Sequence, residues 1–276
     1  MSKIPVAAIQ MVSTHDRDEN LRQAEQLLRQ AAGQGARIAV LPENFAVLDT
    51  ANMPVHGGQE TTPAGPIRGF LAEQARNLGL WIVGGSLPVA ARPDGEALTD
   101  RVRASCIVVD DQGQEVARYD KIHLFDAQVE DSQGQYRESD TFEPGEQLVT
   151  VETPAGRLGL AICYDLRFPE LFRQLREQQV DWITVPSAFT WQTGDAHWQP
   201  LLRARAIENQ VWVVAPGQGG QNSPLRRTYG HTMIVDPWGR VLDELPEGAG
   251  VIMAELDSDY QREVRQRMPV WQHRRL

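Results

Sequence analysis

Short apolar runs alternate with amphipathic segments along most of this chain. Residues 4–12, IPVAAIQMV, have the composition of a first strand, and apolar residues recur at helical spacing after Asp18. A second fully apolar run, residues 38–41, follows that helical segment and ends at Pro42. Strand, helix and strand in this order are typical of an α/β chain, in which the central strands are buried on both faces.

The same alternation continues toward the C-terminal end. The apolar runs predict further strands at residues 81–89, 103–110, 115–125, 158–162, 181–189, 211–218, 231–239, 241–245 and 251–256. Helical spacing predicts helices over residues 67–77, 169–178 and 190–210, and a last helix from residue 258 into a basic, aromatic tail. The polar stretch 126–147 is a long surface excursion of the kind that is often functional. No repeat or linker interrupts the pattern, so we expect one domain over residues 1–276.

Composition and charge restrict the classes of function. The 41% of hydrophobic and 23% of charged residues are ordinary for a soluble globular protein. A net charge of −10 argues against a nucleic-acid or anionic membrane partner, although a few arginines in one pocket would still admit an acidic small substrate. No apolar stretch reaches about 18 residues and the N-terminal segment lacks a secretory cleavage site, so we expect no membrane span and a cytoplasmic location.

The chain has two cysteines, which occupy different sequence contexts. With no C-x-x-C pair and no Cys/His cluster at zinc spacing, neither a disulfide scaffold nor a structural metal site is expected. Cys106 lies in the middle of a predicted strand and is expected in the core. Cys163 lies where a strand becomes a helix, a turn that raises a nucleophile above the sheet. The structural alternative for Cys163 is a small hydrophobic residue that ends a core strand.

Three predicted strands end near residues capable of chemistry, namely Glu43, Lys121 and Cys163. Sites in open α/β sheets form at the carboxyl ends of strands, so these side chains could converge. A thiol with a pKa of about 8.5 is only slightly ionised at neutral pH and needs a base. A Cys–His pair is the rival arrangement, with a partner among His123, His197 and His231, although His231 is also expected to bond within a turn.

Three segments carry a resemblance to a known family: LPENF at 41–45, DKIHLFD at 120–126 and AICYDLRFPEL at 161–171. They resemble, in order and separation, the three catalytic motifs of the nitrilase superfamily of carbon–nitrogen hydrolases. The resemblance implies a four-layer α-β-β-α sandwich and a reaction that uses neither a metal nor an organic cofactor.

The resemblance also implies roles for individual residues. Glu43 would be the general base, Lys121 would stabilise the transition state, and Cys163 would be the nucleophile. A second active-site glutamate of the family is best matched by Glu138. The backbone N–H of Tyr164 would join Lys121 in binding the oxyanion, and the positive charge of Lys121 would favour the thiolate.

The second half of the chain indicates a branch of the family. Segments 186–210, 227–241 and 268–275 resemble the branch that includes deaminated glutathione amidase and omega-amidase. This likeness implies cleavage of a small acidic 2-oxo amide, first of all deaminated glutathione, to 2-oxoglutarate and cysteinylglycine through an acyl-thioester. 2-Oxoglutaramate, N-carbamoyl compounds and nitriles are alternative substrates. The non-enzymatic alternative is a silent relative that binds an acidic metabolite or a partner protein.

The substrate's carboxylate needs a cationic partner, and Arg167 is the predicted clamp. The alternative for Arg167 is an ion pair with Asp165 or Glu170. Three further residues are predicted to contact the substrate: Tyr164, Phe189 and Thr190. Trp191 is a candidate pocket wall beside them. Family members commonly form dimers through the helix that corresponds to residues 169–178 of this chain, so a homodimer or higher homo-oligomer is expected. The alternative is that Leu171, Phe172 and Leu175 on that helix face the chain's own core.

Overall fold

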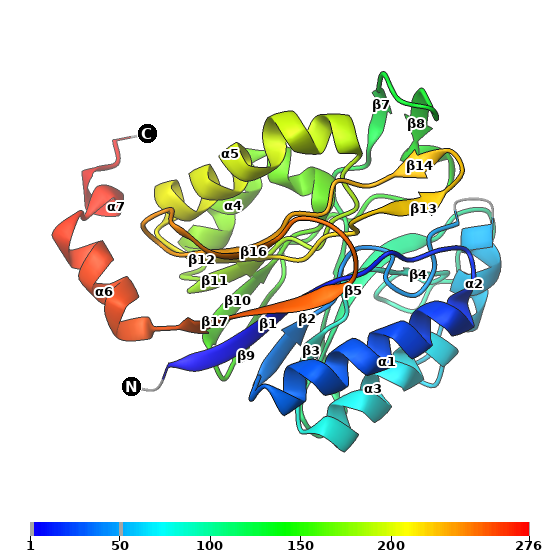
Figure 1. Cartoon of the computed structure of the whole chain (residues 1–276), viewed down its shortest axis with the longest axis horizontal. Coiled ribbons are helices and arrows are strands. Elements are labelled where there is room, and N and C mark those ends of the chain that lie inside the picture. The colour runs from blue at the N-terminus through cyan, green and yellow to red at the C-terminus, as the bar shows by residue number, and fades with distance from the viewer. Residues whose placement is uncertain (1–2, 50–51, 276) are drawn as a thin grey trace.

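The computed structural model describes residues 3–49 and 52–275, and two β-sheets stacked face to face form its centre (Figure 1). Within these residues, the first sheet has seven strands in the order β17-β1-β2-β3-β5-β4, with β6 paired to β5. Their bounds are β1 (Ile4–Gln10), β2 (Ile38–Val40), β3 (Trp81–Val83), β4 (Leu87–Val89), β5 (Arg103–Val109), β6 (Glu115–Asp120) and β17 (Gly250–Leu256).

The second sheet has six strands in the order β16-β15-β12-β11-β10-β9 within the same described ranges. Their bounds are β9 (Thr150–Thr153), β10 (Gly156–Leu160), β11 (Trp182–Thr184), β12 (Trp212–Ala215), β15 (Thr232–Val235) and β16 (Val241–Leu245). Two small hairpins stand outside these sheets: β7 (Asp126–Gln128) with β8 (Gln135–Arg137), and β13 (Gln221–Ser223) with β14 (Arg226–Arg227).

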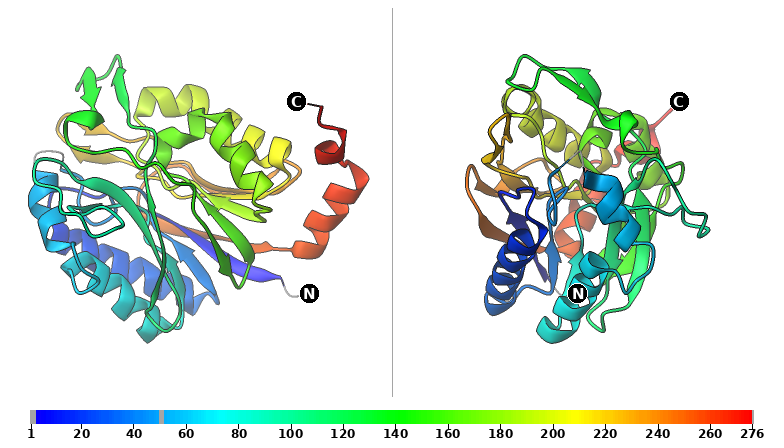
Figure 2. Two further views of the ribbon diagram at one scale, coloured as in Figure 1. Left: turned by 180° about the vertical axis from the view of Figure 1, so that it is seen from behind. Right: turned by 90° about the vertical axis from the view of Figure 1, so that its right-hand side faces the viewer.

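A pair of helices covers the outer face of each sheet. Helices α1 (Arg17–Gly33) and α3 (Pro66–Leu78) lie on the first sheet, and α4 (Pro169–Glu177) and α5 (Trp191–Asn209) lie on the second (Figures 1 and 2). The layers therefore follow the order α-β-β-α, which confirms the predicted four-layer sandwich. The remaining helices are α2 (Met53–Gln59), α6 (Ser258–Arg267), α7 (Val270–His273) and the 3-10 turns η2 (Glu138–Asp140) and η3 (Cys163–Arg167).

Alternate residues of a central strand pack into different layers. In β1, Val6 and Ala8 belong to the core that includes Leu158 and Leu160 of β10. Their neighbours, such as Ile9, belong instead to the core formed with α1 and α3. This two-residue period is the geometry of a strand, and burial on both faces explains why β1 is apolar up to Ile9.

The strand directions bring distant segments to one edge of the sandwich. Strands β1, β2 and β3 are parallel, and so are β10, β11 and β12. Strand β6 is antiparallel to β5, which is itself antiparallel to β3, so β6 runs in the same direction as β2. The carboxyl ends of β2 and β6 therefore share an edge. Figure 1 shows α2 and the two hairpins at the end of the molecule opposite α6 and α7.

Several predicted strands are shorter than expected because their ends leave the sheet. The predicted strand 81–89 is two strands, β3 and β4, separated at Gly85, whose φ is 54°. Strand β11 ends at Thr184, strand β1 at Gln10 and strand β6 at Asp120. The predicted surface excursion 126–147 contains the β7–β8 hairpin and η2. Within the described ranges, no helix combines the length and apolarity needed to cross a bilayer.

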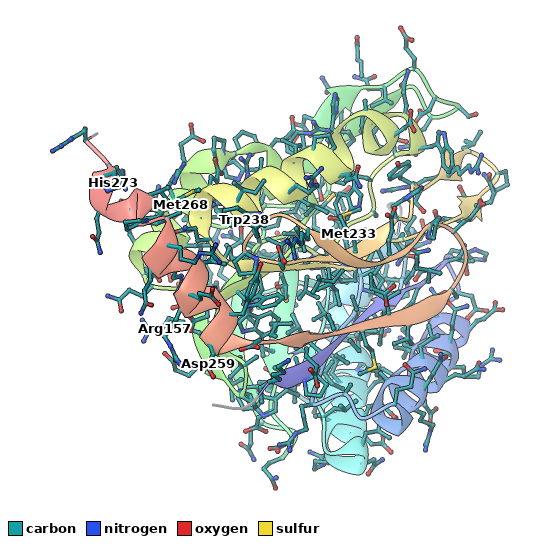
Figure 3. The ribbon with its side chains drawn as sticks, turned by 60° about the vertical axis from the view of Figure 1, so that its left-hand side comes forward. Arg157, Met233, Trp238, Asp259, Met268 and His273 are labelled. Carbon is teal, nitrogen blue, oxygen red and sulfur yellow. The ribbon has the colours of Figure 1, made fainter. Side chains whose placement is uncertain are left out.

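The predicted helical tail packs on one flank of the second sheet as α6 and α7. Gln261 Nε2 donates to the carbonyl of Asp181 at 2.6 Å and to that of Gln210 at 3.0 Å, which ties α6 to the start of β11 and the end of α5. Figure 3 shows Asp259, Met268 and His273 along this tail. Trp238, labelled in Figure 3, is 47% exposed and lines a hollow together with residues of α6.

Candidate active site

Cys163 is the first residue of η3 and follows the end of β10, at Leu160, by three positions. Its φ is 48°, in the left-handed region that non-glycine residues seldom adopt. The Cys163 N–H donates to the carbonyl of Pro186 at 2.9 Å, and this bond helps to hold the turn in place. The cysteine therefore lies at the strand-to-helix turn that the sequence predicted, with 9% of its surface exposed.

A buried carboxylate fixes this turn. Asp165 is fully buried, and its Oδ2 accepts hydrogen bonds from Ile162 N at 2.8 Å and Tyr119 Oη at 2.6 Å. Its Oδ1 lies 3.1 Å from His123 N, which donates to it, and 2.7 Å from His123 Nδ1. Asp165 thus ties the turn that carries Cys163 to the end of β6, which carries Lys121.

The predicted lysine lies between the two predicted glutamates. Lys121 Nζ is 2.9 Å from Glu43 Oε1 and 2.8 Å from each carboxylate oxygen of Glu138. The main chain holds both acids: Ala188 N donates to Glu43 Oε2 at 2.7 Å, and Phe125 N donates to Glu138 Oε2 at 2.6 Å. The structure therefore brings Glu43, Lys121, Glu138 and Cys163 together on the wall of one cavity.

The charges in this cluster determine the state of the thiol. Burial raises the pKa of Cys163 well above its usual range, and the nearby Glu43 carboxylate raises it further, against the opposing effect of Lys121. Burial alone would lower the pKa of Lys121, but Glu138 and Glu43 raise it more strongly. Burial likewise raises the pKa of Glu138, while Lys121 opposes the shift. Lys121 therefore favours the thiolate, in the direction that the sequence led us to expect, but burial and Glu43 outweigh it and leave the pKa of the Cys163 thiol raised.

The geometry does not support the rival Cys–His pair. Among the residues that the structure describes, no histidine lines a cavity that Cys163 borders. Each candidate has another polar partner: His123 with Asp165, His197 with Arg167, and His231 with Glu244. The other cysteine, Cys106, is buried in the core as expected.

Cys163 also borders a second, smaller cavity. We call the cavity with the two glutamates the first cavity. The second cavity shares Phe125, Cys163 and Ala188 with it and is otherwise lined by Tyr164, Arg167, Phe189, Thr190 and Thr193. All four residues predicted to contact the substrate are among these lining residues. Trp191 is not among them; its ring contacts Tyr229 instead.

Arg167 has the surroundings of a binding residue. Its guanidinium carbon lies 5.7 Å from the centre of the Tyr164 ring and 5.3 Å from that of Phe189, and Nη1 is 3.1 Å from His197 Nδ1. Across residues 3–49 and 52–275, the ion pairs include none between Arg167 and a carboxylate, so the alternative pairing with Asp165 or Glu170 is not formed.

Arg226 is one of several cavity residues that the sequence did not single out. Arg226, in the β13–β14 hairpin, lines the first cavity, and its Nε is buried with no hydrogen-bond partner. Its only signal in the sequence is its position directly before the segment 227–241 that resembles the family branch. Two adjacent arginines after a proline are typical of an exposed turn, so the pattern did not single out Arg226.

Comparison with known proteins adds to this geometry. The family model of the carbon-nitrogen hydrolases matches residues 5–266. The chain belongs to the carbon-nitrogen hydrolase family. A deaminated glutathione amidase of Yersinia enterocolitica is 42% identical to this carbon-nitrogen hydrolase over 276 residues, which cover 100% of this chain and 94% of the relative. A deaminated glutathione amidase of Homo sapiens is 42% identical over 275 residues, which cover 98% of this chain and 82% of the relative.

A solved structure agrees with the same assignment. Nit3 of Saccharomyces cerevisiae, a member of branch 10 of the nitrilase superfamily, superposes on this carbon-nitrogen hydrolase with a TM-score of 0.87. The two are 32% identical, and the match covers 99% of this chain and 97% of Nit3. These findings confirm the predicted family and fold, and they make the protein a hydrolase.

Proposed function

We propose that this carbon-nitrogen hydrolase cleaves the amide of deaminated glutathione, giving 2-oxoglutarate and cysteinylglycine. The observation that carries the chemistry is a single one: Lys121 Nζ is held between Glu43 and Glu138 in the cavity that Cys163 borders. The likeness to two deaminated glutathione amidases at 42% identity supports the choice of substrate.

In the proposed first step, Glu43 removes the proton from the Cys163 thiol as Sγ attacks the amide carbonyl carbon. The raised pKa of the thiol makes this base necessary, because little thiolate exists beforehand. Lys121 Nζ and the N–H of Tyr164 bind the oxyanion. Removing one donor of this kind typically costs about 3–4 kcal/mol of transition-state stabilisation.

The intermediate collapses when Glu43 returns the proton to the departing nitrogen, which leaves as the amine of cysteinylglycine. Glu43 then takes a proton from water as the water oxygen attacks the thioester carbon. The C–S bond breaks and Cys163 regains its proton from Glu43. The product acid loses the second proton of the water to solvent and departs as 2-oxoglutarate. Glu43 suits this exchange better than Glu138, because Glu43 accepts from Lys121 Nζ through one oxygen only, whereas both oxygens of Glu138 accept from Nζ and one also accepts from Phe125 N.

Glu138 positions the lysine in this proposal. Its carboxylate keeps Lys121 protonated and restricts Nζ to one side of the cavity. The carboxylate and keto oxygens of the 2-oxoglutaryl group would bind Arg167 in the second cavity, with Tyr164, Phe189 and Thr190 around them. Replacing Arg167 with alanine should therefore reduce activity on acidic amides.

The proposal also places the enzyme in the cytoplasm as a homodimer. Leu171, Phe172 and Leu175 of α4 are buried in the chain's own core, which favours the second of the two interpretations of that helix. A dimer through α4 would have to use the opposite face of the helix, where polar side chains lie.

The test compares release of 2-oxoglutarate from deaminated glutathione and from 2-oxoglutaramate, with Cys163→Ala as the blank. We expect a strong preference for deaminated glutathione that is abolished in the blank. A preference for 2-oxoglutaramate would replace the proposal with an omega-amidase. Turnover of neither substrate, together with equal inertness of Cys163 and Cys106 toward iodoacetamide, would support a silent binding protein.

A further inference from the structure

The two cavities that meet at Cys163 divide the space around the reacting carbon. An amide substrate has an acyl part and an amine part, and both must be accommodated while the carbonyl carbon lies next to Sγ. Phe125 and Ala188 border both cavities, so the boundary between the cavities lies at the cysteine.

The position of the acid decides which part of the substrate enters which cavity. In the proposed reaction, Glu43 gives the proton to the departing nitrogen, so that nitrogen must face Glu43. Glu43, Lys121 and Glu138 line the first cavity, and none of them lines the second. The amine part therefore lies in the first cavity, and the acyl part lies beside Arg167 in the second.

The first cavity contains an arginine with unused hydrogen-bonding capacity. Arg226 Nη2 makes one long contact, 3.4 Å, with the carbonyl of Ala188, and its Nε is buried without a partner. Its guanidinium carbon lies 5.8 Å from the centre of the Tyr136 ring, which supports the side chain from one side. Within the part of the chain that the structure describes, no carboxylate pairs with Arg226, whereas the adjacent Arg227 pairs with Glu247 at 3.0 Å.

Arg226 is partly buried, and a buried donor such as its Nε is costly unless a ligand completes its hydrogen bonding. Arginine binds a planar carboxylate through two parallel N–H···O bonds, so an anionic group on the substrate would satisfy these donors. A guanidinium thus lies on each side of the scissile bond: Arg167 in the second cavity, and Arg226 in the first, where the exposed Arg137 also lines the wall.

The spacing fits a short peptide. Ala188 accepts from Arg226 through its carbonyl and donates to Glu43 through its N–H, so one residue separates the guanidinium from the acid that protonates the leaving nitrogen. An extended dipeptide spans at most about 7 Å from its nitrogen to its carboxylate. That length can bridge a gap of one residue, whereas ammonia, the leaving group of a primary amide, has no carboxylate to offer.

We propose that Arg226 binds the C-terminal carboxylate of a dipeptide leaving group and makes the enzyme favour peptide amides over primary amides. This assignment deepens the proposed function and rests on it. Arg226 would act on binding of the amine part, while Arg167 would act on the acyl part that both kinds of substrate share.

The test measures kcat and KM of Arg226→Met on deaminated glutathione and on 2-oxoglutaramate, which have the same acyl group. We expect kcat/KM for deaminated glutathione to fall about 10- to 100-fold, mainly through KM, as loss of a charge-assisted bond predicts. Turnover of 2-oxoglutaramate should be unchanged, which also shows that the variant is folded. Arg227→Met, which removes the adjacent exposed guanidinium, is the matched control and should change neither substrate.

Two further measurements keep the test decisive. Cysteinylglycine should inhibit 2-oxoglutaramate hydrolysis by the native enzyme and should inhibit Arg226→Met more weakly. The strength of inhibition of Arg226→Lys should lie between those of the native enzyme and Arg226→Met. Equal losses on both substrates would mean that Arg226 acts through Ala188 and Glu43, which would overturn the assignment. Unchanged kinetics on deaminated glutathione would overturn it as well. If the native enzyme did not hydrolyse deaminated glutathione at all, the proposed function itself would fail.

Discussion

Asp165 is the residue whose replacement tests most directly how the turn at Cys163 is held. Each of its carboxylate oxygens accepts from one main-chain N–H, Oδ2 from Ile162 and Oδ1 from His123. In Asp165→Asn, whichever way the amide is turned, its NH₂ group faces one of these two N–H donors. One buried main-chain donor is then left unsatisfied, and the bonds that remain lose the assistance of the charge.

The structure sets the size of this effect. An unsatisfied buried donor costs about 1–3 kcal/mol, and bonds to a charged acceptor are worth about 1.5–3 kcal/mol each, so the substitution should cost roughly 2–5 kcal/mol. This is a large share of a typical total stability of about 5–15 kcal/mol. Because the turn carries Cys163, we expect the rate of amide hydrolysis to fall together with the stability.

Urea unfolding followed by circular dichroism measures the loss, provided that the dependence on denaturant concentration is the same in both proteins. Glu73→Gln is the matched control, since it makes the same chemical change at an exposed position of α3 and should stay within about 0.5 kcal/mol of the native protein. A loss below about 1 kcal/mol in Asp165→Asn would refute the reasoning that two main-chain donors depend on the two oxygens.

Two other predictions concern the residues around the thiol. In Gly85→Ala the new Cβ would lie 2.0 Å from the carbonyl oxygen of Pro42, so the free energy of unfolding should fall by about 2–5 kcal/mol. Gly79 also has a left-handed backbone but has open space around it, so Gly79→Ala should lower the free energy of unfolding by only about 1–2 kcal/mol. Similar losses in the two variants would contradict this prediction. In the native enzyme the Cys163 thiolate, measured by its ultraviolet absorbance against Cys163→Ala, should form only above the usual thiol pKa of about 8.5, because burial and Glu43 raise the pKa of this thiol. Glu43→Gln should lower the midpoint of this titration. Thiolate already present at neutral pH would disprove the raised pKa.

Much of the fold could be predicted because its causes are local. Short continuous apolar runs mark β1 and β2, the helical period of the apolar positions marks α1, and the abrupt change from strand to helix marks Cys163 as the residue at the turn. The break inside the predicted strand 81–89 was missed, because its cause is the close approach of Gly85 to Pro42, a contact between segments distant in sequence.

The site could be predicted only in part, for the same physical reason. Glu43, Lys121 and Cys163 end or follow strands, so their convergence follows from the direction of those strands. Glu138 was found through resemblance alone, since nothing local distinguishes it from other acids in a polar loop. Asp165 and Arg226 owe their importance to partners from other elements, and the raised pKa of the Cys163 thiol depends on burial and charges that only the folded arrangement creates.

The placement of Lys121 between two carboxylates has a consequence for the end of the proposed reaction. The amide that enters is uncharged at its reacting carbon, and the acid that leaves carries a new negative charge at the same point. One ammonium already serves Glu43 and Glu138, so a product carboxylate at the reacting carbon would meet two like charges beside that ammonium. The two carboxylates of the proposed catalytic cluster therefore repel the product carboxylate, which favours release of the product acid over its rebinding.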